Sequence, residues 1–251
     1  MPYGMYISAA GADVQSQRLQ VLSNNLANVD TPGFKRELAV LQSRHAEAIE
    51  RRQDSPSSRS INNVGGGVRV AETVTDFGGG TLRQTGIPTD MAIDGDGFFL
   101  VAKEGQQLLT RAGNFRLSPQ GNLLTQQGHA VLSTKGQPVV LDPLQPWRLL
   151  EGGVLEQAGT RTQLALVKPR SLGDLVKAGE NLFFSLAPAP PLPVPQRRLV
   201  GGYLEQSTVK PAQEMMELIE TSRAFEANIR MIQNQDSIIG SLVSRALRPA
   251  G

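Results

Sequence analysis

Apolar residues near the C-terminus recur at alternating steps of three and four positions. The stripe comprises Met215, Leu218, Phe225, Ile229, Ile232, Ile239, Val243 and Ala246. Ser222 and Asp236 interrupt it at two of its positions. Such steps keep side chains on one face of a helix and are typical of a coiled-coil seam. The pattern predicts a long helix from Pro211 to Leu247, because proline is favoured in the first turn of a helix.

A second apolar stripe lies near the N-terminal end. It comprises Met5, Ala12, Leu19, Leu22, Leu26 and Val29. We therefore expect a helix over Tyr6 to Val29. Thr31-Pro32-Gly33 should end this helix, because proline disfavours helix at the preceding residue and glycine accepts the turn that follows. A second, shorter helix is predicted over Lys35 to Arg52.

The middle of the chain shows short apolar stretches separated by glycine and proline turns. The candidate strands are Val68–Thr75, Phe98–Val101, Gln107–Thr110, Asn114–Leu117, Leu123–Thr125, Ala130–Leu132, Leu164–Val167 and Leu182–Leu186. Strands at this spacing predict an all-β region. The polar stretch Gln53 to Gly67 is predicted to be a loop. The proline-rich stretch Ala187 to Pro195 should be an extended spacer, with binding to a proline-recognising module as the alternative.

These patterns together predict an α+β chain. We expect long N- and C-terminal helices that pack as a coiled-coil-like bundle, and a mainly-β middle domain. Residues 1–67 and 206–251 would form a terminal helical assembly domain, and residues 68–205 a β-rich outer domain with the proline-rich segment at 187–195. The partner of the C-terminal seam stays open. It is the N-terminal helix of the same chain, other copies of the chain, or both.

Composition narrows the classes of function. The net charge of the 251-residue chain is only +2, and its basic residues are scattered, which argues against a nucleic-acid partner. The chain has no cysteine, so disulfides and thiol chemistry are excluded. No apolar run reaches membrane-spanning length, so no membrane insertion is expected. The first residues lack the basic start and apolar stretch of a cleavable signal peptide.

Side chains that could carry catalysis or hold a cofactor are few. His45 and His129 are the two histidines, and neither has the neighbours that a metal site needs. Asp94-Gly95-Asp96-Gly97 resembles the start of a calcium loop, but Phe98 stands where that loop needs another Asp or Asn. A tight turn explains this stretch better. We predict no enzyme, no cofactor and no metal site.

Several stretches resemble the motifs of bacterial flagellar rod and hook proteins. Residues 23–36 read Ser-Asn-Asn-Leu-Ala-Asn-Val-Asp-Thr-Pro-Gly-Phe-Lys-Arg. The middle of the chain contains Ile-Asp-Gly-Asp-Gly-Phe-Phe at 93–99 and Leu-Thr-Arg-Ala-Gly-Asn-Phe at 109–115, followed by Gly-Asn-Leu at 121–123. Near the C-terminus stand Gly202 to Val209, and Glu214 to Arg223 with Phe225 and Glu226. The matches keep their order and span nearly the whole chain.

The resemblance implies a structural axial subunit of the flagellar basal-body rod. In that family both terminal helices pack into a tube around an export channel, and the β-rich middle faces outward. The implied partners are other copies of the chain, other rod and hook proteins, and the flagellar type III export apparatus. Export by that apparatus needs no cleavable signal peptide, and the implied location is the rod that spans the periplasm.

The position within the rod is less sharply indicated, because proximal and distal rod proteins share these motifs. Pro211 with Met215 and Met216, and the stretch from Ser222 to Glu226, resemble the proximal type. The stretch Asn24 to Lys35 resembles the distal type equally. We favour the proximal rod.

The resemblance and the two stripes together define a predicted assembly interface. It comprises Leu19, Leu22, Leu26, Asn28, Gly33, Phe34, Leu218, Phe225, Ile229, Ile232, Ile239 and Val243. Gly33 would turn the chain after the first helix, and the amides of Asn24, Asn25 and Asn28 would satisfy backbone groups at a crowded junction, or serve only as turn residues. The alternative function is a soluble coiled-coil adaptor or export chaperone that does not polymerise.

Overall fold

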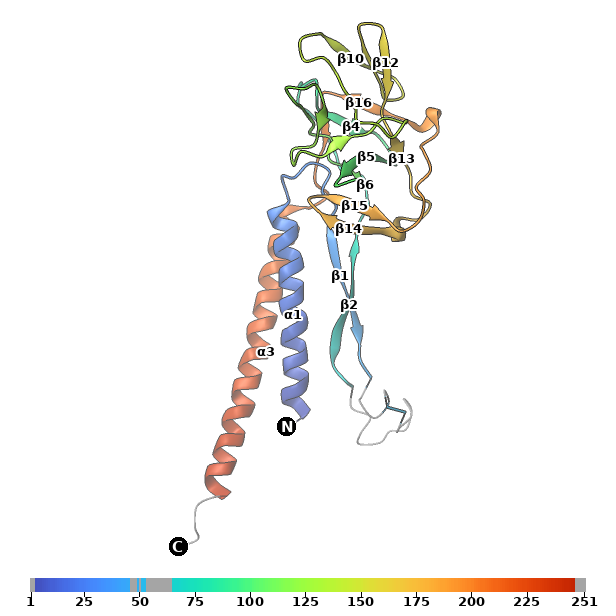
Figure 1. Cartoon of the computed structure of the whole chain (residues 1–251). Coiled ribbons are helices and arrows are strands. Elements are labelled where there is room, and N and C mark those ends of the chain that lie inside the picture. The colour runs from blue at the N-terminus through green and yellow to red at the C-terminus, as the bar shows by residue number, and fades with distance from the viewer. Residues whose placement is uncertain (1–2, 46–48, 50, 53–64, 247–251) are drawn as a thin grey trace. The chain divides into compact units, whose positions relative to one another are not determined.

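The computed structural model describes residues 3–45, 49, 51–52 and 65–246. These residues form two compact units. Unit 1 contains the chain up to Ala27, the stretch Glu37–Asp76 and the chain from Lys210 onward; unit 2 contains Asn28–Arg36 and Phe77–Val209. Helices and strands are shown in Figure 1.

The helices are α1 (Tyr3–Ala27) and α3 (Pro211–Ala246), with short 3-10 helices η1 (Leu172–Asp174) and η2 (Val194–Gln196). The strands are β1 (Glu37–Ser43), β2 (Val68–Thr75), β3 (Leu82–Gln84), β4 (Met91–Ile93), β5 (Phe98–Lys103), β6 (Gln106–Thr110), β7 (Arg116–Leu117), β8 (Leu123–Leu124), β9 (Ala130–Val131), β10 (Trp147–Leu150), β11 (Val154–Gln157), β12 (Thr160–Gln163), β13 (Leu166–Val167), β14 (Leu175–Gly179), β15 (Leu182–Ser185), β16 (Leu199–Gly201) and β17 (Tyr203–Glu205). The predicted α+β composition, with a helix at each end and a mainly-β middle, is confirmed.

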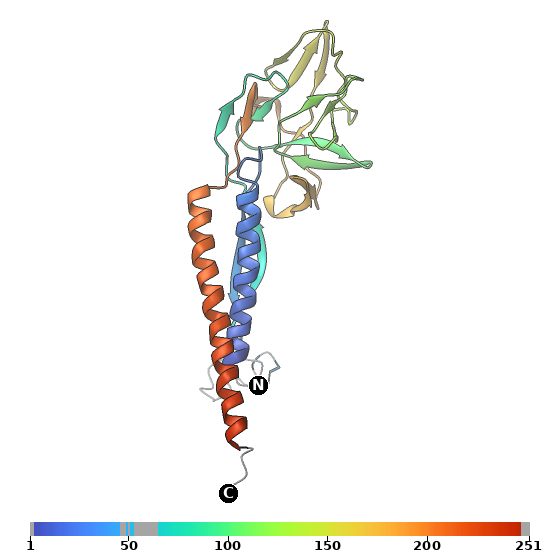
Figure 2. The same ribbon diagram turned by 90° about the vertical axis from the view of Figure 1, so that its left-hand side faces the viewer.

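Unit 1 consists of the two long helices and one β-hairpin. Figures 1 and 2 show α1 and α3 side by side and running in opposite directions. The hairpin β1–β2 lies along α1. Tyr6 on α1 accepts a hydrogen bond from the Arg44 guanidinium, 3.1 Å away, at the end of the hairpin. α1 therefore has α3 on one side and the hairpin on another.

The predicted helix over Lys35 to Arg52 is wrong. Glu37–Ser43 is strand β1 and pairs antiparallel with β2, with Leu38 opposite Val74 and Val40 opposite Glu72. Short apolar stretches are ambiguous between helix and strand when judged by periodicity alone. Pairing with the predicted strand Val68–Thr75, which is confirmed as β2, decides in favour of strand. Most of the predicted loop Gln53 to Gly67 lies outside the described residues, as does part of the wrongly predicted helix.

Unit 2 is built mainly of short antiparallel strands. Its largest sheet has the order β14-β15-β6-β5-β9-β8-β7, with β13 paired to β5. The hairpin β5–β6 pairs Phe99 with Thr110 and Val101 with Leu108. The predicted strands between Phe98 and Leu132 correspond to β5 through β9, and the two later ones to β13 and β15. Smaller sheets join β10-β11-β12, β16-β4 and β17-β3, and none of these was predicted.

The core of unit 2 lies between these strands. Its fully buried side chains include Met91, Phe99, Val101, Leu123 and Leu164. The Phe99 ring meets Phe115 edge to face, with ring centres 5.0 Å apart. Burial of each such side chain contributes about 1.5–3 kcal/mol, so this cluster is a main source of the stability of unit 2.

The proline-rich segment is not a free spacer. Leu192, in its middle, is buried, and its backbone N–H donates to the Leu166 carbonyl at 2.7 Å. Pro191 forms a bridge with Val167, so the segment lies along β13. Proline has no N–H to donate, whereas Leu192 inserts its side chain into the core and also donates its N–H to the sheet. The segment runs without a helix up to Pro193 and then enters η2, and through Leu192 it belongs to the core.

Candidate assembly site

The C-terminal seam lies on the flank of the contact between α3 and α1. Leu218, Phe225, Ile232 and Ile239, spaced by seven, are half-buried along that flank. Ile229 is half-buried as well, whereas Met215 is 53% exposed and Val243 51% exposed. α1 therefore covers only part of the seam, and the remaining apolar surface is open in the single chain.

On α1, the predicted interface residues face different surroundings. Leu22 is 5% exposed, and Leu19 and Leu26 are half-buried. These residues stabilise unit 1 from within, because burial of leucine is favourable. Whether they also contact another subunit stays a prediction.

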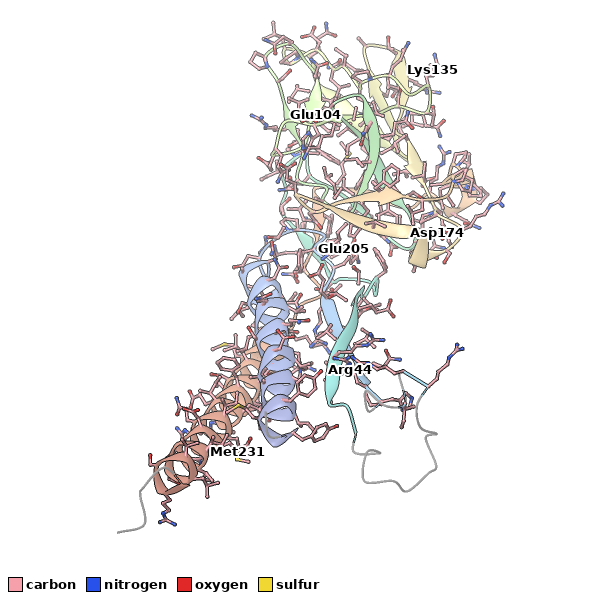
Figure 3. All side chains as sticks on the ribbon, turned by 60° about the horizontal axis from the view of Figure 1, so that its bottom comes forward. Arg44, Glu104, Lys135, Asp174, Glu205 and Met231 are labelled. Carbon is pink, nitrogen blue, oxygen red and sulfur yellow. The ribbon has the colours of Figure 1, made fainter. Side chains whose placement is uncertain are left out.

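Other exposed apolar residues of α3 were not part of the predicted seam. They are Met216, Ile219, Met231, Ile238 and Leu242, each at least half exposed. Met231 is labelled on α3 in Figure 3. Contiguous exposed apolar surface usually marks an interaction site in a soluble protein. The available signal was the second spacing of seven from Met231 to Ile238, which runs beside the seam.

The hairpin β1–β2 adds a second apolar surface to unit 1. Leu38, Val40, Leu41, Val68 and Val74 are each about 40% exposed. A two-stranded ribbon is marginally stable by itself and needs a third element to pack on. α1 supplies that element within the chain, and the exposed side chains remain free to contact another surface. The sequence prediction missed this surface because it expected a helix, not a strand that pairs with β2, at Glu37–Ser43.

Asn25 joins the three elements of unit 1. Its side-chain amide donates to the Glu37 carbonyl at 2.8 Å and to Glu214 Oε2 at 3.2 Å, and its Oδ1 accepts from the Glu37 N–H at 2.9 Å. Asn25 and Glu214 are fully buried. The expectation that asparagine amides satisfy backbone groups at a crowded junction is confirmed for Asn25. Asn28 instead accepts from the Thr31 hydroxyl at 3.1 Å, within the turn that follows α1.

In unit 2, three motifs distant in sequence meet at a buried ionic cluster of Lys35, Arg111 and Glu205. Lys35 Nζ lies 2.6 Å from Glu205 Oε1, and Arg111 lies 3.4 Å from Glu205 Oε2. Glu205 lies at the end of β17 and is labelled in Figure 3, while Arg111 directly follows β6. All three side chains are at least nine-tenths buried.

Hydrogen bonds to the backbone surround this cluster, although Arg111 Nε and Glu205 Oε2 have no hydrogen-bond partner among the described residues. Lys35 Nζ donates to the Gly78 carbonyl at 2.7 Å, and the Gly80 N–H donates to Glu205 Oε1 at 2.9 Å. Arg111 donates to the Gly95 carbonyl at 2.6 Å. Burial lowers the pKa of the Arg111 guanidinium, and the nearby Glu205 carboxylate opposes that shift. Buried charges need such partners, because an unpaired ion in a protein interior is costly.

Position 33, beside this cluster, requires glycine because a side chain would not fit. Its φ is +66°, and a Cβ at this position would overlap the backbone of Arg111. Its N–H donates to the Glu205 carbonyl at 2.8 Å. Glycine tolerates positive φ without strain. The predicted turn at Gly33 is confirmed, and the structure adds the close approach to Arg111 as its cause.

Phe34 is buried within unit 2. Its exposed fraction is 6%, and Lys177 Nζ lies 4.5 Å above its ring centre. The Thr208 N–H donates to the Phe34 carbonyl at 3.1 Å, and the Thr208 hydroxyl accepts from the Arg36 N–H at 2.9 Å. The turn after α1 is thereby fixed to the strand end that precedes α3. Its part in contacts between subunits stays a prediction.

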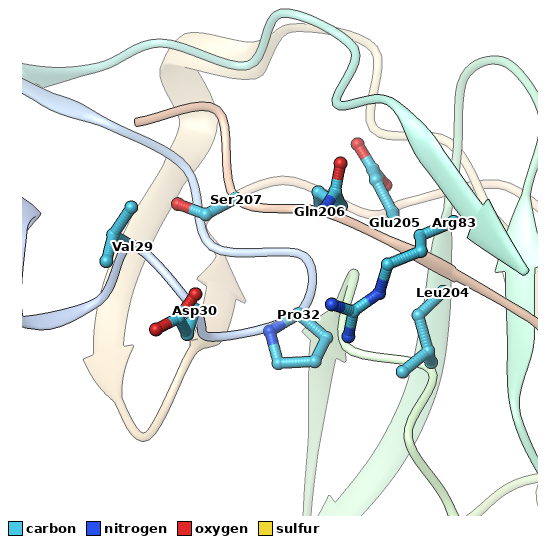
Figure 4. Close-up of a pocket in the computed structure, with 8 residues that line it drawn as sticks. All are labelled: Val29, Asp30, Pro32, Arg83, Leu204, Glu205, Gln206 and Ser207. Atoms are coloured by element: carbon cyan, nitrogen blue, oxygen red, sulfur yellow. The ribbon is translucent and has the colours of Figure 1, made fainter. Parts of the chain in front are cut away.

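A small polar pocket opens beside the cluster (Figure 4). Its volume is about 150 Å³. It is lined by Val29, Asp30, Pro32, Arg83, Leu204, Glu205, Gln206 and Ser207. A drug-sized ligand needs a larger and mostly apolar cavity. This pocket has room for a few waters or one side chain, and nothing in its lining suggests catalysis.

His129 and Asp96, which were considered above as possible ligands or catalytic groups, form surface ion pairs. His129 Nε2 lies 2.7 Å from Glu180, and Lys103 lies 2.8 Å from the same carboxylate. The bonds from Lys103 and His129 lower the pKa of Glu180. Lys168 lies 2.6 Å from Asp96 and lowers the pKa of that carboxylate through its hydrogen bond and charge. His45 is exposed.

Within residues 3–45 and 65–246, no three His, Asp or Glu side chains gather as a metal site would require. No helix in the described part of the chain is both long and apolar enough to cross a membrane.

Comparison with known proteins adds three family models, which match separate stretches of the chain. The model for flagella basal body rod proteins matches residues 5–35. The model for the flagellar hook protein FlgE/F/G D1 domain matches residues 92–148. The model for the flagellar basal body rod FlgEFG protein C-terminal region matches residues 200–245. Lys35, Arg111 and Glu205 each lie in a different one of these stretches.

Whole-length relatives agree with the family models. The chain is 32% identical to the flagellar basal-body rod protein FlgF of Caulobacter vibrioides, over 98% of each chain. It is 32% identical to FlgG of the same organism, over 92% of this chain and 95% of that protein. It is 31% identical to FlgG of Agrobacterium fabrum, over 96% of this chain and 98% of that protein.

Proposed function

This chain belongs to the flagellar basal-body rod protein family, and we propose that it polymerises through its terminal helices into a hollow rod around the export channel. As a member of that family it is a structural subunit of the flagellar rod and not an enzyme. It assembles with other rod and hook components of the basal body. The polymer would transmit torque along the rod.

The observation that supports polymerisation is the open apolar surface of α3. Met215, Ile219, Met231, Ile238 and Val243 are each at least half exposed in the single chain. We propose that helices of neighbouring copies cover this surface with coiled-coil-like packing. Residues 1–67 and 206–251 would form the assembly domain, and residues 68–205 would face outward. Many weak contacts between copies add up to a stable polymer by avidity.

A charge placed in the seam tests this proposal. Ile229→Asp puts a carboxylate on the half-buried flank of α3, where an apolar contact between copies would have to desolvate it. Sedimentation velocity over a range of concentrations should show large assemblies for the native chain and none for the variant. Circular dichroism should show that the β-rich unit still folds.

Ser237→Asp is the control, because Ser237 is exposed on α3 and its neighbours one turn away, Gln233, Asn234, Gly240 and Ser241, are not large apolar residues. It should assemble as the native chain does. Normal assembly of Ile229→Asp would contradict the seam as the contact. A small oligomer of fixed size at all concentrations would instead favour the alternative, a coiled-coil adaptor or export chaperone.

Position and export are separate parts of the proposal. We place the chain in the proximal rod, on the resemblance of Pro211, Met215, Met216 and the stretch Ser222 to Glu226 to the proximal type. Loss of the whole rod in basal bodies from cells lacking the protein would support this position, and loss of only its outer part would contradict it.

Export would use the flagellar type III apparatus, so mass spectrometry of assembled protein should find the N-terminal segment intact.

A further inference from the structure

We propose that a polar column on α3 fixes the register in which the two terminal helices pair. The column consists of Glu214, Thr221, Asn228 and Gln235, which repeat every seven residues. On α1 a second series has the same repeat, Gly4, Gly11, Arg18 and Asn25, and Gly4, Gly11 and Asn25 face members of the column. The inference concerns one chain and does not depend on polymerisation.

Two contacts match glycine with an amide. A Cβ on Gly4 would lie 2.8 Å from Gln235 Nε2, and a Cβ on Gly11 would lie 2.9 Å from Asn228 Oδ1. Both distances are shorter than a normal contact, so a side chain at either position would require the flexible end of Gln235 or Asn228 to move. Glycine is disfavoured inside helices relative to alanine, and its presence at both positions fits this close approach.

A third contact extends the series by two further repeats. Asn25 donates to Glu214 at 3.2 Å, and both residues are fully buried. Moving seven residues toward the C-terminus of α1 thus corresponds to moving seven residues toward the N-terminus of α3. Thr221, the remaining column member, is 2% exposed. The centre of the helix contact is therefore polar along its length, and the apolar residues lie on its flanks.

Hydrogen bonds of Thr208 with Phe34 and Arg36 tie the turn after α1 to the residues before α3, but along the helices the apolar flank cannot set the register by itself. Leu218, Phe225, Ile232 and Ile239 also repeat every seven residues, so sliding α3 by one repeat replaces one large apolar side chain by another. Polar residues at the centre of a helix contact specify register in coiled coils, at a cost in stability. The polar column supplies the distinction that the flank lacks.

A slip of one repeat in either direction disrupts the column. It separates Glu214 from Asn25 and moves both Gln235 and Asn228 away from their own glycines. In one direction Gln235 meets Gly11, but Asn228 meets Arg18, which is much larger. In the other direction Asn228 meets Gly4 and Glu214 meets Arg18, but Gln235 passes the N-terminal end of α1. Gln235 Oε1 already has no hydrogen-bond partner among the described residues, so its fit beside Gly4 is a matter of space. These losses disfavour each slipped pairing.

The test replaces the amides by leucine in the full chain. The variant carries Asn228→Leu and Gln235→Leu, and the matched control carries Asn234→Leu and Gln233→Leu, the same changes at exposed positions. Because the chain has no cysteine, Gln20→Cys and Ser237→Cys, both at exposed positions, can carry one spin label each.

Pulsed electron–electron double resonance then measures the distance between the labels. A slip of one repeat displaces the helices by about 10 Å. The native chain and the control should each give one narrow distance. The leucine variant should keep its helix content and melt at a higher temperature, yet show a second distance in at least about a tenth of the molecules. One unchanged distance in that variant would overturn the proposal. Loss of helix content would also overturn the proposal, since the amides would then be needed for pairing itself. Several distances in the native chain would overturn it as well.

Discussion

At the scale of single residues, the buried Lys35 connects parts of the chain that lie 170 positions apart. Its ammonium group lies against Glu205, which also faces Arg111. Glycine at position 33 allows the backbone to approach Arg111 closely. The family motifs that contain these residues thus have a physical role within unit 2, namely to fix the turn after α1 to the β-rich core.

Removal of one partner should destabilise unit 2 strongly. Lys35→Met removes the closer of the two cations that face Glu205, and we expect a loss of about 3 kcal/mol in the free energy of unfolding. Glu205→Leu removes the carboxylate that both buried cations face and should cost about 5 kcal/mol. Urea denaturation measures both values. Lys210→Met, at an exposed lysine, should change stability by less than about 0.5 kcal/mol, and an equal loss in that control would argue against the cluster.

Gly33 and Gly86 form a matched pair for a test of steric approach. Both have positive φ, +66° and +71°, but an added Cβ meets the Arg111 backbone at Gly33 and nothing at Gly86. Gly86→Ala should cost about 1–2 kcal/mol from backbone strain alone. Gly33→Ala should cost clearly more, since the backbone must also move. Equal losses in thermal unfolding would show that the close approach does not matter.

At the scale of elements, the hairpin β1–β2 buries few of its own side chains and depends on other elements for packing. Most of its side chains are exposed, whereas the strands β5 and β6 in unit 2 contain several fully buried residues. A ribbon of two strands needs packing from elsewhere to persist. Its opening should therefore take less free energy than opening of the unit 2 core.

Hydrogen exchange checks this difference within one sample. Amides of Glu37–Ser43 should exchange at least about tenfold faster than those of Phe98–Lys103, because local opening needs less free energy where few apolar contacts are lost. Equal protection in the single chain would mean that α1 stabilises the hairpin as firmly as a core sheet. Added protection of the hairpin at concentrations where the chain assembles would identify it as a second contact between copies.

At the scale of the whole molecule, the chain passes four times between its two units, after Ala27, Arg36, Asp76 and Val209. Unit 2 includes the short stretch Asn28–Arg36 between α1 and β1, and it ends at Val209, just before α3. We expect two transitions in scanning calorimetry, because compact units with separate cores can unfold separately. Glu205→Leu should lower only the transition of unit 2. A single transition that shifts as a whole would show that the units unfold together.

The sequence by itself determined the elements whose signal is local. The helix at each end, the strands from β5 to β9 and the turn at Gly33 follow from periodicity, proline and glycine. These features depend on neighbours within a few positions, so a short window of sequence contains them. The order of the motifs was also sufficient to identify the family.

Tertiary structure alone decided which distant residues meet. Glu37–Ser43 became a strand because β2 lay available to pair with it. Leu192 became a core residue because β13 accepted its N–H. Lys35 and Glu205 became partners, and Gly11 came to face Asn228. The free energy of such contacts depends on groups brought together only by folding, and no local pattern in the chain encodes their pairing or their register.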